Sequence, residues 1–262
     1  MHSLFVVAIA AVLVFAAIVI LDTRYGLFRA ADHFDSPLKR GLAYAWLGLF
    51  LLFVTYLVAG SARRVPTREQ LIKTPFYQLF ALHLILVVFL FVWWLLSGRP
   101  NVFAYLNIQR QNVGRAILAG CAIGVGGWIF TVLMALVVVL ILTAAGVMPK
   151  NPTVPPMIGW LVSLPVWKKA LVVLSAMTIE EAFFRGWLQK RVGLIASTLL
   201  FALAHSGFGQ PVLLVGVSLI SLVIGTAFYR TKNLIPGIIA HGIFDAVQLF
   251  VVIPIVFSLT GS

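Results

Sequence analysis

Five ionisable side chains lie in apolar surroundings near the C-terminal end of the chain. They are Glu180, Glu181, His205, His241 and Asp245, and all fall within the last 83 of 262 residues. An uncompensated charge is costly in hydrocarbon, so an ionisable residue there indicates a functional site. A carboxylate can act as a general base, and a histidine can move protons or stabilise negative charge. These residue types predict a site that transfers protons or activates water.

The spacing of these residues predicts which of them meet. Three pairs are four positions apart and share a helix face: Glu181 with Arg185, Phe201 with His205, and His241 with Asp245. We expect Glu181 and Arg185 to form a structural ion pair, and the Phe201 ring to wall the imidazole of His205. Glu180 is about 100° away from Glu181 around a helix, so it is free to face another helix.

Counting along the sequence places the site residues at a common depth. Glu180, His205, His241 and Asp245 lie between 9 and 14 residues from a flanking Lys or Arg. At about 1.5 Å per helical residue, they lie roughly 14–21 Å from one face of a membrane. Three separate apolar segments therefore bring polar groups to one slab near the middle of the membrane.

Three motifs in order resemble a known family. Residues 180–185 match EExxxR and are followed by a glycine, residues 201–205 match FxxxH, and residues 241–245 match HxxxN/D. In this order and on successive apolar segments, they resemble the CPBP family of intramembrane proteases, which includes enzymes like CAAX prenyl protease 2 and bacteriocin-processing proteins. The resemblance covers roughly residues 165–258.

The resemblance implies a role for each motif residue. Glu180 would be the general base that activates a water molecule, and His205 would share that water. His241 and Asp245 would stabilise the oxyanion of the tetrahedral intermediate. The prenyl-protease branch typically has Asn where this chain has Asp245, and a carboxylate cannot donate a hydrogen bond. Asp245 is therefore expected to orient or charge His241.

Two questions of chemistry stay open at the level of the sequence. We expect a site with no cofactor and no metal, because the chain lacks HExxH and the resemblance implies a glutamate-based mechanism. The alternative is a divalent metal such as zinc, which two histidines and one or two carboxylates can bind. Its ligands would come from Glu180, His205, His241 and Asp245.

The function that these residues favour is an intramembrane endopeptidase acting on a membrane-anchored protein or peptide. A prenylated CAAX-type tail, a peptide precursor, a C-terminal sorting signal and a membrane-bound regulator all fit as substrates. One alternative is a proton- or ion-coupled transporter, because Glu, His and Asp at mid-membrane also build proton relays. Another is a non-proteolytic scaffold or immunity-type member of the same fold.

The elements that must position this site are membrane helices. The chain is 62% hydrophobic and 10% charged, with a mean hydropathy of +1.08, which argues against a water-soluble domain. We predict an all-α, polytopic transmembrane helical bundle with about eight spans, at residues 4–21, 41–60, 76–96, 117–147, 168–190, 192–208, 212–229 and 234–257. The net charge of +12 is spread over the loops between apolar runs, so we expect the lipid bilayer as partner and no nucleic acid.

The organisation divides into two parts. Residues 1–156 form N-terminal transmembrane helices without a motif, and residues 157–262 form the CPBP-like catalytic core. Within the first part, His83 is expected to be a packed polar residue. Gly120, Gly124 and Gly127 have a spacing that allows close helix contact in lipid. We expect a multi-pass integral membrane protein, in the plasma (inner) membrane if the source is prokaryotic.

Overall fold

The computed structural model describes residues 2–26, 32–61, 66–147, 155–208 and 211–260, and every regular element in these ranges is helical. This confirms the predicted all-α class. The longer helices are α1 (His2–Tyr25), α2 (Pro37–Ser61), α4 (Ala81–Leu96), α6 (Val113–Ala144), α9 (Lys190–Ala204), α10 (Pro211–Thr231) and α11 (Leu234–Val247). The shorter ones are α3 (Arg68–Lys73), η1 (Phe76–Phe80), α5 (Val102–Tyr105), α7 (Pro156–Ser163), α8 (Val166–Ser175), η4 (Ser206–Phe208) and α12 (Ile253–Thr260). Three segments are π-helical: η2 (Ala176–Glu180), η3 (Ala182–Gln189) and η5 (Gln248–Val252).

Fewer helices qualify as membrane spans than the sequence predicts. Five helices of the described chain are long and apolar enough to cross a membrane: Pro37–Leu57, Phe76–Leu96, Val113–Ala144, Val212–Thr231 and Leu234–Ser258. A sixth is obtained if the bent pair Pro156–Ser163 and Val166–Ala204 counts as one span. The expected eight spans exceed the five or six that qualify in the described chain, for two reasons. Two of the expected spans fall within that bent pair, and residues 4–21 lie in α1, part of whose side chains are outside the described set.

A glycine lies at the start of the second of the two expected spans that the bent pair contains. Gly193 has φ 81° and ψ 174°, which is not helical, and it lies inside α9. Positive φ is readily available only to glycine, so the chain can turn sharply here. The turn lets the helix that carries the two glutamates be followed closely by the helix that ends at His205.

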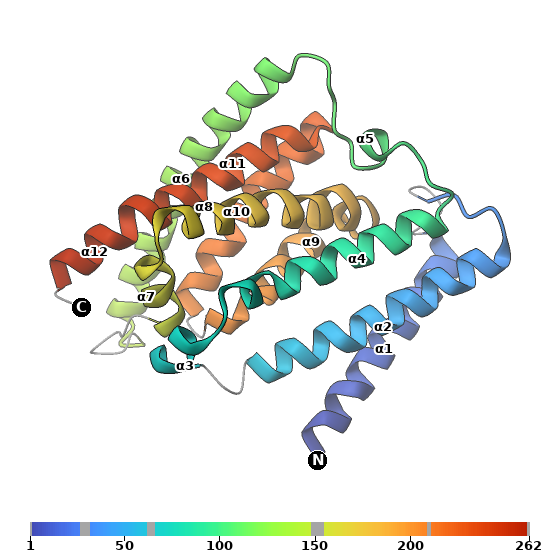
Figure 1. Ribbon diagram of the computed structural model, residues 1–262, viewed down its shortest axis with the longest axis horizontal. Coiled ribbons are helices and arrows are strands. Elements are labelled where there is room, and N and C mark those ends of the chain that lie inside the picture. Colours follow the sequence, from blue (N-terminus) through green and yellow to red (C-terminus); the bar gives the residue numbers. More distant parts are fainter. Residues whose placement is uncertain (1, 27–31, 62–65, 148–154, 209–210, 261–262) are drawn as a thin grey trace.

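Helix α6 packs most extensively against α11, and it lies on the side of the molecule away from α1 and α2 (Figure 1). A Cβ atom added at Gly120 would lie 2.6 Å from Cβ of Ile239, and one at Gly124 would lie 3.0 Å from Cα of Ala240. These distances are shorter than van der Waals contact between carbon atoms. The predicted close contact at the glycines is confirmed, and it sets the position of α11 in the bundle.

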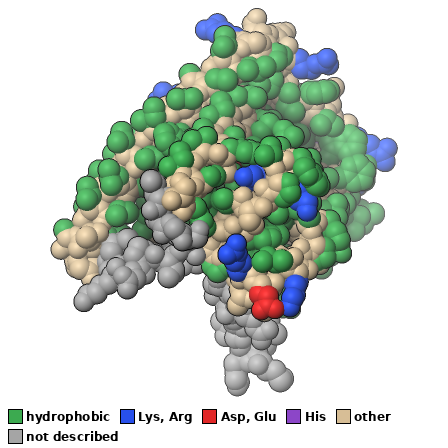
Figure 2. Space-filling model, turned by 60° about the vertical axis from the view of Figure 1, so that its left-hand side comes forward, with side chains coloured by type: hydrophobic (Ala, Val, Ile, Leu, Met, Phe, Trp, Pro, Cys, Tyr) green, Lys and Arg blue, Asp and Glu red, His purple; other side chains and the backbone are tan. Residues whose placement is uncertain are grey.

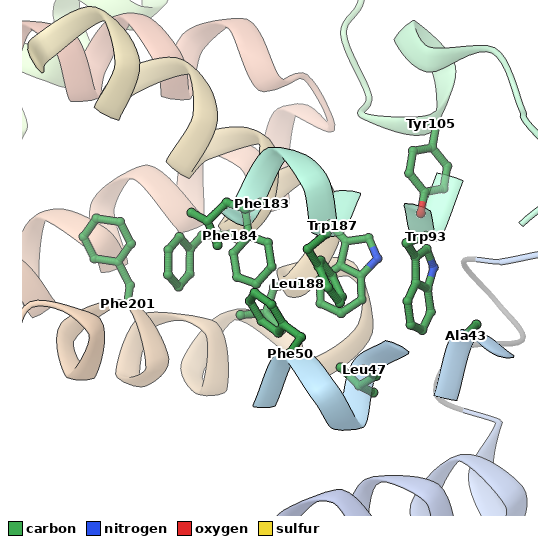
Figure 3. Close-up of a cluster of buried hydrophobic side chains, with 12 residues drawn as sticks. Ala43, Leu47, Phe50, Trp93, Tyr105, Phe183, Phe184, Trp187, Leu188 and Phe201 are labelled. Carbon is green, nitrogen blue, oxygen red and sulfur yellow. The ribbon is translucent and has the colours of Figure 1, made fainter. Parts of the chain in front are cut away.

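An aromatic core joins α4 to η3 and α9. Figure 3 shows it as a row of rings from Phe201 at one end to Trp93 at the other. Neighbouring ring centroids are 4.8 Å apart for Phe184 and Phe201, and 5.1 Å apart for Trp93 and Trp187. Edge-to-face contacts of this kind add to the stabilisation from burial. The row of rings fixes η3 against α4. Its last ring, Phe201, lies next to His205 and His241.

The outer surface suits a lipid environment. The face in Figure 2 is mostly hydrophobic, with scattered Lys and Arg side chains and one small acidic group. Many large apolar side chains are exposed on the long helices, for example Leu118 and Leu140 on α6 and Leu199 on α9. An apolar surface of this extent needs to be covered by lipid tails or by other protein. The protein is a helical membrane protein.

Candidate active site

The two glutamates of the first motif lie on a π-helical stretch. Glu180 ends η2, and Glu181 separates η2 from η3. The hydroxyl of Thr178 donates to the carbonyl oxygens of Leu174 and Ser175, at 2.6 and 3.3 Å. Such a bond supplies a donor to a helix carbonyl where the regular pattern changes. The π-helical turn widens the helix at the glutamates, as is frequent at functional sites.

Glu180 lies between two histidines from other helices. Nε2 of His83, on α4, is 3.1 Å from Oε1 of Glu180, and Nε2 of His205 is 3.8 Å from Oε2. The first distance is a hydrogen bond, while the second is too long for one. Oε2 has no hydrogen-bond partner among the described residues, although its side chain is only 13% exposed. Oε2 and the His205 ring therefore face one another without a direct hydrogen bond.

The tautomer of His205 follows from its own contact. His205 caps the C-terminal end of α9, and its Nδ1 lies 2.8 Å from the carbonyl oxygen of Phe201. A carbonyl only accepts, so Nδ1 carries the proton and donates it. Nε2 therefore faces Glu180. The centroid of the Phe201 ring lies 4.5 Å from that of the His205 ring and 5.9 Å from that of the His241 ring, so it packs near both imidazoles.

The second glutamate belongs to a different group. Arg185 donates to Oε1 of Glu181 at 2.7 Å, which is the expected ion pair, and both side chains are almost fully buried. The same oxygen lies 2.9 Å from Nδ1 of His241. Arg185 also donates to the backbone carbonyl and the hydroxyl of Ser221 on α10, at 3.2 and 2.9 Å. The Glu181–Arg185 pair therefore links this helix to α10 through Arg185 and to α11 through Glu181.

His241 lies between two carboxylates. Its Nδ1 faces Glu181, and its Nε2 is 3.3 Å from Oδ2 of Asp245. Carboxylate oxygens accept hydrogen bonds, so each contact orients a ring N–H. Asp245 is 31% exposed and His205 is 21% exposed, whereas Glu181 is 0% exposed. The accessible side of the site therefore carries His205 and Asp245, and its closed side carries Glu181 and Arg185.

The residues considered for a metal do not form one ligand set. Among the described residues, no three His, Cys, Asp or Glu side chains are grouped so that they could hold a metal ion. Glu180 faces His83 and His205, while His241 directs both of its nitrogens at Glu181 and Asp245. Among the described residues, Glu180 therefore pairs with His205, and His241 pairs with Asp245.

Sequence reasoning missed His83. It was expected to be a packed polar residue, but it makes the one hydrogen bond that Glu180 has to another side chain in the described chain. Its side chain is 11% exposed, and its Nδ1 is buried without a hydrogen-bond partner. The sequence does indicate that His83 is unusual, because it lies deep in an apolar run. Among the first 179 residues, it is the ionisable residue whose depth is comparable to that of the five site residues. Nothing in the sequence pairs it with a residue 97 positions away.

Comparison with known proteins agrees with the motifs. Residues 162–247 match the family described as type II CAAX prenyl endopeptidase, Rce1-like, which confirms the resemblance drawn from the sequence. "Uncharacterized protein YpbD" of Bacillus subtilis (strain 168) is 39% identical over 69 residues, which are 26% of this chain and 36% of that protein. The chain therefore spans about a third of the length of that relative. No solved structure matches. The matched segment contains Glu180, His205, His241 and Asp245, and His83 lies outside it.

Proposed function

We propose that this membrane protein, whose residues 162–247 carry an Rce1-like domain, is an intramembrane endopeptidase. It would hydrolyse a peptide bond in a membrane-anchored protein or peptide, with water activated by Glu180. The matching family, type II CAAX prenyl endopeptidase, makes a prenylated tail the first substrate class to test. The observation that supports the mechanism best is the environment of Glu180, a buried carboxylate with one oxygen bonded to His83 and the other facing His205.

The first step of the proposed reaction is water activation. Oε2 of Glu180 takes a proton from a water molecule held between it and Nε2 of His205, and the resulting hydroxide adds to the carbonyl carbon of the scissile bond. The hydrogen bond from His83 holds Oε1, so that the carboxylate keeps one orientation. His83 is thus a positioning residue in this proposal.

The second step is collapse of the tetrahedral intermediate. The oxyanion then takes the place of Asp245 as acceptor of the N–H at Nε2 of His241, while Glu181 holds the ring through Nδ1. The C–N bond then breaks, and the leaving nitrogen takes the proton from Glu180. The products are a carboxylic acid and an amine, which then exchange a proton to give a carboxylate and an ammonium group, and Glu180 returns to its ionised form. Asp245 and His205 lie on the accessible side, which is where a substrate would approach.

The test is a comparison of protein termini in membranes. Cells that lack the protein would receive the wild type, Glu180→Gln or Glu69→Gln, and the N- and C-terminal peptides of all membrane proteins would be quantified by mass spectrometry. Glu69 is a matched control because it is an exposed glutamate on α3 that pairs with Lys73, outside the site.

We expect new termini with the wild type and with Glu69→Gln, and their loss with Glu180→Gln at equal amounts of protein in the membrane. The same termini at the same level with Glu180→Gln would overturn the glutamate mechanism. No difference between wild type and cells lacking the protein would overturn proteolysis and favour the transporter or scaffold alternatives. The membrane that contains the protein, which we propose is the plasma membrane, can be identified from the same cells by fractionation.

A further inference from the structure

Every acidic side chain of this chain has a basic partner. The seven Asp and Glu residues lie in the described part of the chain, and each contacts a basic partner. The pairs are Asp22–Arg40, Asp32–Arg191, Asp35–Lys39, Glu69–Lys73, Glu180–His83, Glu181–Arg185 and Asp245–His241. The sequence has 19 Lys and Arg residues. Most of them must therefore find their counter-charge outside the chain.

A cavity collects two of these uncompensated cations. It has a volume of about 590 Å³, and its lining includes Lys190, Arg191 and Lys232 together with the polar side chains of Asn107, Gln189 and Tyr229. The volume is within the range of small-molecule sites, about 300–1,000 Å³. The guanidinium of Arg191 is neutralised by the buried carboxylate of Asp32. Arg191 therefore contributes shape to the cavity and no free charge.

Neither lysine forms an ion pair in the described chain, and their hydrogen-bond and ring partners are neutral. Nζ of Lys190 donates to the backbone carbonyl of Tyr105 and lies 3.3 Å from Oδ1 of Asn107, which leaves part of its donor capacity unused. Nζ of Lys232 lies 4.3 Å from the centre of the Tyr229 ring. No acidic side chain lines the cavity. The cavity thus presents two ammonium groups and amide donors to an occupant.

The cavity lies where headgroups of a bilayer would be. Lys232 is in the short connection between α10 and α11, two helices that qualify as membrane spans. Lys190 begins α9, ten residues beyond Glu180. Basic pockets between membrane helices at the interface bind anionic lipid headgroups. We infer that this cavity binds a phosphate group, carried by the headgroup of an anionic phospholipid.

The test measures phospholipid retention by the full chain. The purified protein would be placed in nanodiscs that contain equal parts of phosphatidylglycerol and phosphatidylcholine. It would then be released from the nanodiscs in the mass spectrometer, and the lipids that stay bound would be counted by native mass spectrometry. Lys232→Gln and the double variant Lys190→Gln/Lys232→Gln would be compared with Arg230→Gln. Arg230 is a matched control, because it is an exposed cation two positions from Lys232 that does not line the cavity.

Each cation near the membrane surface changes anionic-lipid binding roughly 5-fold, so the double variant is expected to bind phosphatidylglycerol roughly 30-fold more weakly. Lys232→Gln alone should show roughly the 5-fold effect, which keeps the test valid if Lys190→Gln does not fold. Arg230→Gln should retain the lipid as the wild type does.

A second measurement distinguishes a lipid headgroup from free phosphate. Inorganic phosphate and glycerol 3-phosphate would be added to the protein in a neutral detergent, and thermal unfolding would be followed. Stabilisation by lipid alone assigns the site to headgroups, and lysine-dependent stabilisation by the soluble phosphates assigns it to free phosphate. Equal retention of phosphatidylglycerol and phosphatidylcholine, or no difference between the lysine variants and Arg230→Gln, would refute the site. None of these outcomes depends on proteolysis.

Discussion

The contact between α6 and α11 allows a quantitative prediction from one methyl group. Gly120 faces α11, where an added Cβ would lie 2.6 Å from Cβ of Ile239 and 2.9 Å from the carbonyl oxygen of Pro236. Carbon atoms pack at about 3.5–4.0 Å, so Gly120→Ala requires the helices to separate by about 1 Å. Inserting a methyl group into a packed contact typically costs about 1–3 kcal/mol.

A control on the same helix isolates this packing cost. Gly126 is exposed, and a Cβ there would have no atom within 4 Å. Gly126→Ala carries the same change in helix propensity as Gly120→Ala, so the difference between the two variants reports the contact with α11. Thermal unfolding of both purified proteins in one detergent is the assay. The Gly120 variant is expected to unfold roughly 2–12 °C below the Gly126 variant.

The same perturbation should reach the site. Helix α11 carries His241 two residues and Asp245 six residues beyond Ile239, which contacts Gly120. Cleavage of the substrate found by terminal mass spectrometry should therefore fall in Gly120→Ala and stay near the wild-type rate in Gly126→Ala. Equal unfolding temperatures for the two variants would refute the reasoning, because α6 and α11 would then not be in the close contact described.

Three further predictions concern the site residues. Arg185→Ala leaves Glu181 buried without its cation, so it should lower the free energy of unfolding by about 3–5 kcal/mol, and normal thermal stability would contradict the pairing. His83→Ala removes a hydrogen bond to a charged group, and it should slow cleavage roughly 10–150-fold with partial recovery in His83→Gln; an unchanged rate would show that His83 only packs. Asp245→Asn should keep substantial cleavage activity while His241→Ala should not, and a zinc chelator should leave the wild type active. A dead Asp245→Asn together with chelator inhibition would instead indicate a metal.

The sequence was sufficient for the helical class and for contacts that depend on local spacing. The ion pair of Glu181 with Arg185, the ring contact of Phe201 with His205 and the contact of His241 with Asp245 all occur between positions i and i+4. Such pairs follow from helix geometry alone.

The sequence could not predict the π-helical segments or the contacts between residues on helices that are distant in the sequence. Apolar residues continue through η2 and η3, so their pattern does not reveal the π-helical turns. The contact of Glu181 with His241 joins residues 60 positions apart, and neither motif specifies which glutamate meets which histidine. The expected eight spans exceed the five or six that qualify among the described residues for a related reason, since hydropathy counts apolar runs and does not show that two of them lie largely within Val166–Ala204.

The position of His83 shows that the N-terminal part of the chain contributes a side chain to the candidate site in the C-terminal part. The division into residues 1–156 and 157–262 describes where the motifs are, but α4 supplies the side chain that holds Glu180, and α6 supplies the surface that positions α11. A fragment with residues 157–262 alone would leave Oε1 of Glu180 without its bond to His83. It would also expose the face of α11 that Gly120 and Gly124 cover. Because a carboxylate base needs a fixed orientation to act on one water molecule, the motif-free part of the chain is expected to be required for catalysis as well as for folding.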